Sequence, residues 1–352
     1  MSHSTNRILG PCALALSSLT PFQITFLQSL PKAELHAHLN GCIPISTLQD
    51  MAREANAGRE RESIPEGIKV LADGVVLDQL GDFFGLFPGI YALTSSPSSL
   101  RRAARAVLVD FLGDDVSGAA PGAQCAYLEL RSTPRETAEM SRMQYVCAVL
   151  DEVERYPADR AALIVSLDRR MSAEVLGECI DVACALRKAG RRVVGVDLCG
   201  DPQAGDMDIL GEYFARAKAA GLGITLHIAE TEANSDAETM RLLSYLPNRL
   251  GHATFLNAEA REFVRKNDMC IEICLSSNLL CKTVSTLEAH HIRYYLQHKH
   301  PIAICTDDTL PFCNSLMGEY ALLLAAPPLG LGLSEAEVTE LARMSGSARF
   351  PL

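Results

Sequence analysis

The stretch ALIVSLDRRMSAEVLGECIDVACALRKAGRRVVGVDLCG, residues 162–200, decides the expected fold. It opens with a short apolar run, Ala162–Asp168, continues with an amphipathic segment, Glu174–Ala189, and returns to an apolar run, Val193–Leu198. Gly190 follows the middle segment, where the end of a helix favours glycine. Two apolar runs joined by a helix are typical of parallel strands with a crossover connection. The stretch therefore predicts one strand–helix–strand unit.

The same alternation recurs outward along most of the chain. Eight candidate strands can be assigned, at Ala33–His38, Ala126–Arg131, Ala162–Asp168, Val193–Leu198, Ile224–Ile228, Arg249–His252, Cys270–Leu275 and Ile302–Thr306. Helical patterns lie between most of them, for example at Asp208–Ala220, which Gly221 follows. Eight strands that alternate with helices predict an α/β fold of the TIM-type (β/α)8 barrel class.

The connection after the first strand is unusually long, from Leu39 to Cys125. It contains three helical patterns, at Thr47–Ala55, Leu77–Leu93 and Ser98–Leu112. We expect these extra helices to cap the mouth of the barrel. The segment Val116–Gln124 is rich in glycine and alanine and contains proline, so it predicts a flexible surface insert.

The domain organisation is expected to be simple. Residues 1–29 predict a poorly ordered N-terminal extension, and residues 30–352 a single catalytic barrel domain. A short apolar patch at Ala13–Leu19 leaves a secretory signal as the weaker alternative. The chain stops at Leu352, soon after a helical pattern at Glu340–Arg343, so the C-terminal helix looks truncated.

Composition excludes several classes of function. The net charge of −11 disfavours a nucleic-acid partner, which would be held through its phosphates, although a small anion can still be bound. The 12 cysteines form no CxxC pair, which favours free thiols in a reducing cytosol. No run of about 18 apolar residues predicts a membrane span. We therefore expect a cytoplasmic protein, most simply a monomer.

Most of the candidate strands end in residues that are capable of chemistry. In chain order these residues are His36 and His38; Arg131, Ser132 and Thr133; Asp168; Gly200 and Asp201; His227 and Glu230; His252; Ser276 and Asn278; Asp307 and Asp308. An α/β barrel gathers its active site from the C-terminal ends of its strands. We therefore expect these side chains to converge on one mouth.

The motif His36-Ala37-His38 is a candidate metal site, because residues two apart in a strand point to the same side. Taken alone, the motif could equally be an ordinary pair of histidines. Its place at the end of an apolar strand favours the metal.

The other polar strand ends are each open to a simpler interpretation. His227 could be a satisfied core histidine, Glu230 a solvated loop carboxylate, and His252 a structural histidine. Adjacent acids such as Asp307 and Asp308 often only begin a helix. Together they offer the nitrogen and oxygen ligands of a hydrolytic zinc site, with one position left for water.

Several ordered motifs resemble those of the adenosine and AMP deaminase family, whose members are zinc-dependent hydrolases. They are ELHAHLNG at 34–41, YLELRSTP at 127–134, DRR at 168–170, LCGDP at 198–202, LHIAE at 226–230, RLGH at 249–252 and CTDD at 305–308. Asn40 stands where adenosine deaminases carry Asp. In this position the sequence resembles the adenosine deaminase-like branch of the family. Members of that branch deaminate N6-methyl-AMP.

The resemblance implies a role for each matching residue. It implies one Zn²⁺ per chain, held by His36, His38, His227 and Asp307. It implies that Glu230 gives a proton to the purine ring, and that His252 and Asp308 position and activate water. It implies a substrate pocket formed by His38, Asn40, Tyr91, Arg131, Ser132, Thr133, Pro134, Asp168, Gly200 and Asp308. The expected reaction converts N6-methyl-AMP to IMP and methylamine.

The sequence also departs from the family pattern. Ala253 stands where the family usually has Gly, and Tyr91 where close relatives carry a histidine in the substrate pocket. Three alternatives stay open: an adenosine deaminase, another zinc amidohydrolase, and a truncated isoform with reduced or no activity. For Arg131 alone, a buried structural cation paired with an acid is as good an interpretation as a phosphate ligand.

Overall fold

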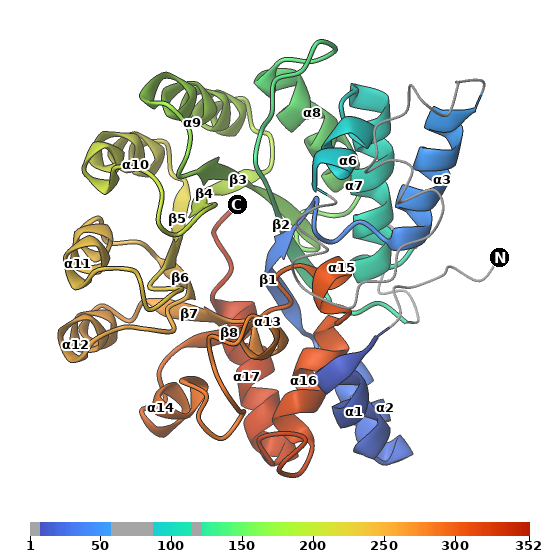
Figure 1. The fold of residues 1–352 in the computed structure, drawn as a ribbon, viewed down its shortest axis with the longest axis vertical. Helices are drawn as coiled ribbons and strands as arrows, with labels where there is room; N and C mark the ends of the chain where they lie inside the picture. Colours follow the sequence, from blue (N-terminus) through green and yellow to red (C-terminus); the bar gives the residue numbers. More distant parts are fainter. Residues whose placement is uncertain (1–7, 58–86, 115–121) are drawn as a thin grey trace.

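The protein is an eight-stranded parallel barrel surrounded by helices, as the computed structural model shows (Figure 1). The structure describes residues 8–57, 87–114 and 122–352. The strands follow chain order around the sheet: β1 Ala33–His38, β2 Tyr127–Ser132, β3 Ala161–Asp168, β4 Val193–Cys199, β5 Gly223–Ile228, β6 Arg249–His252, β7 Cys270–Ile273 and β8 Ile302–Ile304. The predicted barrel is therefore confirmed.

The first and last strands meet and nearly close the barrel. The His38 N–H donates to the Asp307 carbonyl oxygen over 3.3 Å. The Thr306 N–H donates to the Glu34 carboxylate over 2.9 Å. Both bonds lie beside the histidine motif, so closure also fixes the positions of candidate site residues.

Helices surround the barrel. They are α8 Arg142–Val153, α9 Ala173–Lys188, α10 Leu210–Ala219 after the short 3-10 helix η2 Met207–Ile209, α11 Asp236–Ser244, α12 Ala258–Lys266, α13 Leu275–Leu280, α14 Ile292–Gln297, α15 Thr309–Phe312, α16 Leu316–Leu324 and α17 Glu335–Ser347. The sequence explains such boundaries: α9 begins after the N-cap Ser172 and ends with Arg187 and Lys188, which suit its negative end. The short helices α13 and α15 lie near the mouth of the barrel. No helix in the described ranges is long and apolar enough to cross a membrane.

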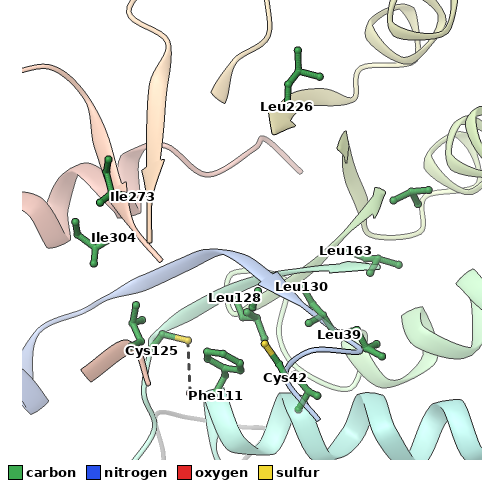
Figure 2. Close-up of a cluster of buried hydrophobic side chains, with 14 of the residues drawn as sticks. Leu39, Cys42, Phe111, Cys125, Leu128, Leu130, Leu163, Leu226, Ile273 and Ile304 are labelled. Carbon is green, nitrogen blue, oxygen red and sulfur yellow. Dashed lines mark hydrogen bonds between the residues drawn. The ribbon is translucent and has the colours of Figure 1, made fainter. Parts of the chain in front are cut away.

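Alternate residues of each strand face opposite sides of the barrel wall. Leu128 and Leu130 of β2 pack in the outer apolar layer with Phe111 (Figure 2). Glu129 and Arg131, between and beside them, are fully buried in the barrel interior. The interior therefore contains charges as well as apolar side chains, and these charges must find partners.

The long first connection contains helices, as predicted. α3 spans Ile45–Asn56, α6 spans Phe87–Leu93 and α7 spans Pro97–Leu112. Most of the predicted Leu77–Leu93 helix and residues 116–121 of the predicted insert lie outside the described residues. Gln124, at the end of that insert, is well anchored: its amide donates to Asp110 and accepts from the Leu316 N–H.

The N-terminal segment differs from the expected poorly ordered extension. Two helices, α1 Gly10–Ser18 and α2 Pro21–Ser29, occupy most of it. Cys12 is buried against α16, where its thiol donates to the Glu319 carboxylate over 3.7 Å. The apolar patch that was considered as a signal is thus part of a helix packed on the barrel domain.

A helix follows the last strand, in agreement with the helical pattern around Glu340–Arg343. This helix, α17, packs against β8 and β1. Beyond α17, the Phe350 ring lies under the barrel. A Cβ added to Gly195 or Gly223 would come within 2.5 Å of that ring. The Phe350 N–H donates to Glu129 over 2.7 Å, so this segment seals the N-terminal end of the barrel.

Candidate active site

Four histidines from three strands converge at the C-terminal mouth of the barrel. His36 and His38 come from β1, His227 from β5 and His252 from β6. The ring of His36 lies 4.5 Å from that of His227 and 5.0 Å from that of His252, between centroids. The Nε2 atoms of His38 and His227 are 3.2 Å apart. The predicted convergence of these strand ends is therefore observed.

Asp307 brings a carboxylate to the same cluster. Its Oδ1 lies 3.6 Å from His38 Nε2 and 3.8 Å from His36 Nε2. Its backbone is left-handed, with a φ of 65°, which turns the chain sharply after β8. Ser277 of α13 donates to its Oδ2 over 2.8 Å and so fixes the carboxylate plane.

Two of the histidines are held from behind, through Nδ1. His36 Nδ1 lies 2.5 Å from the Glu272 carboxylate, and His227 Nδ1 lies 3.0 Å from Asp197 and 2.9 Å from the Leu198 carbonyl oxygen. Such contacts fix the ring orientation of metal-ligating histidines. His36 Nε2 is buried and has no hydrogen-bond partner among the residues that the structure describes. This unpartnered nitrogen, aimed at a carboxylate and further imidazoles, fits a divalent metal such as zinc.

The charges of the cluster also suit a cation. Burial, Arg131 and His227 hold the pKa of His36 well below its usual value. Burial and the neighbouring His227 do the same to the pKa of His38. Burial opposes a charge on His227, but the Asp197 carboxylate raises the pKa of its ring to about 9. His36 and His38 are thus neutral and able to act as ligands, whereas a metal ion would have to displace the proton of His227.

A buried thiol lies beside this cluster, which the sequence did not indicate. Ligand atoms of Cys274, His36 and Asp307 all lie within 4.8 Å of one another. Burial and the nearby Asp307 carboxylate raise the pKa of the Cys274 thiol well above its usual value. The thiol therefore keeps its proton, and the histidines and Asp307 are the better ligands.

The predicted catalytic residues surround the metal-type cluster. His252 Nε2 lies 3.8 Å from a Glu230 oxygen and 3.8 Å from Asp307 Oδ2. Glu230 is 30% exposed and so can reach a ligand in the mouth. Asp308 is close to Gly41, where an added Cβ would stand 1.7 Å from Asp308 Oδ1. Burial and Asp307 raise the pKa of Asp308 well above its usual range.

Asp168 and Gly200 form a second edge of the mouth, at the ends of β3 and β4. A Cβ added to Gly200, whose φ is +97°, would lie 2.6 Å from Asp168 Oδ1, so only glycine fits. Arg170 donates to the Asp168 carboxylate over 2.6 Å. Burial opposes the Asp168 charge, but bonds from Arg170 lower the pKa of this carboxyl overall. The predicted substrate contact is thus an ionised acid with one cationic partner.

A third edge contains polar groups after β1 and β2. Ser132 and Tyr145 share a hydrogen bond of 2.8 Å, and the Tyr145 hydroxyl donates to Asn40 Oδ1 over 3.3 Å. The Asn40 side-chain nitrogen is buried, and no described residue accepts a hydrogen bond from it. Thr133 lies 3.7 Å from the Cys199 thiol, and Pro134 is buried beside it. Asn40 therefore has a free donor to offer a ligand.

Arg135 and Tyr145 are the residues that the sequence analysis missed at this edge. The Arg135 guanidinium lies over the Tyr91 ring, 3.9 Å from its centroid, and donates to Thr94 over 2.9 Å. It forms no ion pair with a carboxylate in the described ranges. Burial, only partly offset by the Arg135 charge, raises the pKa of Tyr91 to about 12, so its hydroxyl stays neutral. A basic residue directly after a polar strand end was the available signal for Arg135.

Arg131 requires a correction, because it does not face the mouth. Its guanidinium is fully buried inside the barrel and donates to Glu272 over 2.8 Å and to the Leu35 carbonyl oxygen. The long side chain reaches back along the strand, toward the N-terminal end. Arg131 is thus the structural cation of the alternative interpretation, and it cannot bind a phosphate at the mouth.

The departure at Ala253 also has a physical basis. His252 and Ala253 both have a left-handed backbone, with φ values of 60° and 49°. Glycine adopts this conformation at least cost, which explains a preference for glycine at position 253. The chain accepts some strain here to present His252 to the cluster.

Comparisons with known proteins agree with this geometry. The family model described as adenosine deaminase matches residues 31–350. The N6-mAMP deaminase of Arabidopsis thaliana is 33% identical over 92% of this chain and 94% of that protein. The N6-methyl-AMP deaminase of Homo sapiens is 34% identical over 86% of this chain and 84% of that protein.

The fold is also similar to those of solved structures of related proteins. The crystal structure of the Arabidopsis N6-mAMP deaminase MAPDA has a TM-score of 0.80 at 34% identity, and covers 93% of this chain and 96% of that one. Arabidopsis ADAL complexed with IMP has a TM-score of 0.78 at 33% identity, with 93% and 94% covered. The chain therefore belongs to the adenosine deaminase family.

Proposed function

We propose that the protein is a zinc-dependent hydrolytic deaminase that converts N6-methyl-AMP to IMP and methylamine. One observation carries the proposal: a metal-type cluster of histidines and Asp307 shares its mouth with a neutral Asn40 and with Arg135, which pairs with no carboxylate of the described residues. The metal-type cluster suits hydrolysis. Asn40 and Arg135 suit a substrate with an anionic 5′ end.

One zinc ion would be held by His36, His38, His227 and Asp307. These ligand types match catalytic zinc, and Glu272 and Asp197 orient two of the rings. Bound zinc supplies Lewis-acid activation of water near neutral pH. Cys274 takes no part in this set.

The surrounding residues divide the proton transfers between them. Glu230, which is partly exposed, donates a proton to a ring nitrogen of the purine as C6 is attacked. His252 and Asp308 hold the attacking water on the correct face and accept its proton. The C6–N6 bond then breaks, and the amine leaves with a proton. Gly200 allows the base to approach the backbone closely, beside Asp168.

Charge at the third edge selects a nucleotide over a nucleoside. Two unit charges about 4 Å apart interact by roughly 4 kcal/mol at an effective dielectric of about 20. An acid at position 40 would repel a phosphate by this order of energy, whereas the Asn40 amide can donate to it. Arg135, Ser132 and Thr133 add a cation and hydroxyl donors. The relatives named for N6-methyl-AMP, and a relative solved with IMP, support this assignment.

The test is a deamination assay with adenosine, AMP and N6-methyl-AMP. We expect kcat/KM to be highest for N6-methyl-AMP and higher for both monophosphates than for adenosine. Asn40→Asp should lower kcat/KM for the monophosphates by at least tenfold and change that for adenosine little. Equal kcat/KM for adenosine and the monophosphates would instead assign the chain to the adenosine deaminases.

Metal analysis of the purified protein tests the cofactor separately. We expect close to one equivalent of zinc per chain, lost on His227→Ala and retained in the matched Cys274→Ser variant. A folded protein with only a small fraction of an equivalent would contradict the zinc assignment. The proposal also takes the enzyme to be a cytosolic monomer that acts on free nucleotides, not on nucleic acid.

A further inference from the structure

A second cavity lies beside the active site, outside the barrel wall. It is open to solvent, has a volume of about 460 Å³, and is lined by the loop after β6, by Arg261 of α12, and by residues 283–295 around the start of α14. This volume is in the range of small-molecule sites. None of the catalytic side chains assigned above lines it. We call it the β6 cavity.

The charged residues of the β6 cavity favour an anion. Arg261 and Arg293 both line it, and Glu288 is its single acidic lining residue. The Arg261 guanidinium lies over the Tyr294 ring, 5.4 Å from its centroid, and Arg293 Nε donates weakly to the Leu287 carbonyl oxygen over 3.4 Å. Neither arginine forms an ion pair within the part of the chain that the structure describes. Two cations against one acid leave a positive charge for a ligand to meet.

The walls of the β6 cavity favour a flat ligand. Phe255, Tyr294 and Tyr295 line it, together with His290 and His291, whose rings stack 4.4 Å apart. Aromatic faces at several angles bury a planar ring system well. The remaining lining includes hydroxyl groups, such as that of Thr283, that can bond to ribose.

His291 links the cavity to the end of β6. Its Nε2 lies 3.0 Å from the His252 carbonyl oxygen, which can only accept, so Nε2 carries the proton. Its Nδ1 is then an acceptor, which is shielded from solvent and has no hydrogen-bond partner among the described residues.

We propose that the β6 cavity is a second, non-catalytic ligand site for a purine nucleoside monophosphate. Such a ligand has a planar base for the aromatic lining and a phosphate for Arg261 and Arg293. Its occupancy would bear on the active site, because His291 holds the His252 carbonyl and Ala253 lines the cavity. The left-handed turn at His252 and Ala253 connects the β6 cavity to the active site.

Binding stoichiometry of IMP, measured by titration calorimetry on the zinc-loaded protein, tests the proposal. We expect two equivalents of IMP per chain. The double variant Arg261→Gln/Arg293→Gln should bind one, with the lost site weakened at least tenfold and kcat/KM at low substrate unchanged. Arg265→Gln is the matched control, because Arg265 lies on the same helix but pairs with Glu262 outside the cavity. It should keep both equivalents.

The remaining arms separate this site from the proposed catalytic one. Arg135→Gln should weaken only the site at the barrel mouth. Stoichiometry is read without turnover, so a protein with no deaminase activity can still show the site that is sensitive to Arg261 and Arg293. A single equivalent in the wild type that only Arg135→Gln removes would overturn the second site. So would two equivalents that persist in the double variant. Inorganic phosphate binding as tightly as IMP would overturn the nucleotide assignment.

Discussion

The two ends of the barrel both contain buried polar and charged side chains, but these side chains are partnered differently. At the N-terminal end, Arg249 meets the carboxylates of Glu129 and Glu272, each over 2.7 Å, and Phe350 covers them. At the C-terminal mouth, His36 Nε2 lies 3.8 Å from Asp307 Oδ1, and the Asn40 amide nitrogen is buried with no hydrogen-bond partner among the described residues. Close pairs of opposite charges hold the wall together at the first end. At the mouth, wider spacing between polar atoms leaves them able to bind a ligand.

The largest expected effect comes from a change at the mouth alone. Glu230→Gln removes a proton donor without removing a proposed metal ligand. We expect kcat to fall on the order of hundredfold or more. The zinc content and the urea unfolding midpoint should stay at the wild-type values. A loss of zinc together with activity would make Glu230 a ligand.

A change at the opposite end should do the reverse. Arg249→Leu leaves Glu129 and Glu272 buried without their shared cation, which should cost about 3–5 kcal/mol of unfolding free energy. The matched exposed pair is Arg265 with Glu262, and Arg265→Leu should cost no more than about 1 kcal/mol. Urea unfolding of both variants measures the difference. Similar costs for the two would remove the contrast between the ends.

A third buried carboxyl sharpens the contrast, because only neutral groups surround it. Ser276, Asn314 and the Cys12 thiol all donate to Glu319. Burial, only partly offset by these bonds, raises its pKa to about 7. Burial also opposes the charge on Glu272, but Arg131 and Arg249 hold the pKa of that carboxyl well below its usual value.

Stability should therefore depend on pH through Glu319. Its folded pKa is above the unfolded one, so its stabilising contribution is full below about pH 4 and is lost as pH rises through 7. A rise from 4.5 to about 7 corresponds to roughly 3 kcal/mol. Relative to Glu319→Gln, the wild type should lose this amount between about pH 5 and pH 8, as measured by urea unfolding. A constant difference across that range would show that Glu319 does not titrate there.

Two glycines, one at each end, give the smallest expected change in stability. Gly41→Ala would place a Cβ on Asp308, and Gly223→Ala would place one on the Phe350 ring. Each should cost about 1–3 kcal/mol of unfolding free energy through overpacking. Only Gly41→Ala should also lower kcat, because it displaces a proposed catalytic carboxyl. Equal loss of activity in both would mean that the two ends are not separable.

Much of the barrel could be predicted because strands and helices have different periodicities. β1 and β6 begin and end where the sequence predicts. β7 is shorter than predicted: the apolar run Cys270–Leu275 continues into α13, and periodicity cannot separate a buried strand from a buried helix over so few residues. As a result Ser277, which bonds to Asp307, was missed.

The candidate site, like the barrel, could be predicted in part from the sequence. Polar residues at strand ends identified the histidines and Asp307, because the fold fixes where strand ends meet. Arg131 was misplaced because its long side chain extends back into the barrel, and the direction of such a side chain is not contained in strand periodicity. Tyr145 lies on α8 and is far from any strand end along the sequence. Its bond to Ser132 therefore depends on tertiary packing alone.

The seal at Phe350 has a consequence for the order of assembly during synthesis. Phe350 contacts Glu129 and the positions of Gly195 and Gly223, all of which leave the ribosome well before it. β1 must likewise wait for β8 before the barrel can close. A nascent chain with seven strands therefore exposes an open sheet edge, and its interior charged side chains are in contact with water. Partly folded chains of this kind aggregate readily. We expect growing chains of this protein to depend on chaperones until Phe350 has been translated.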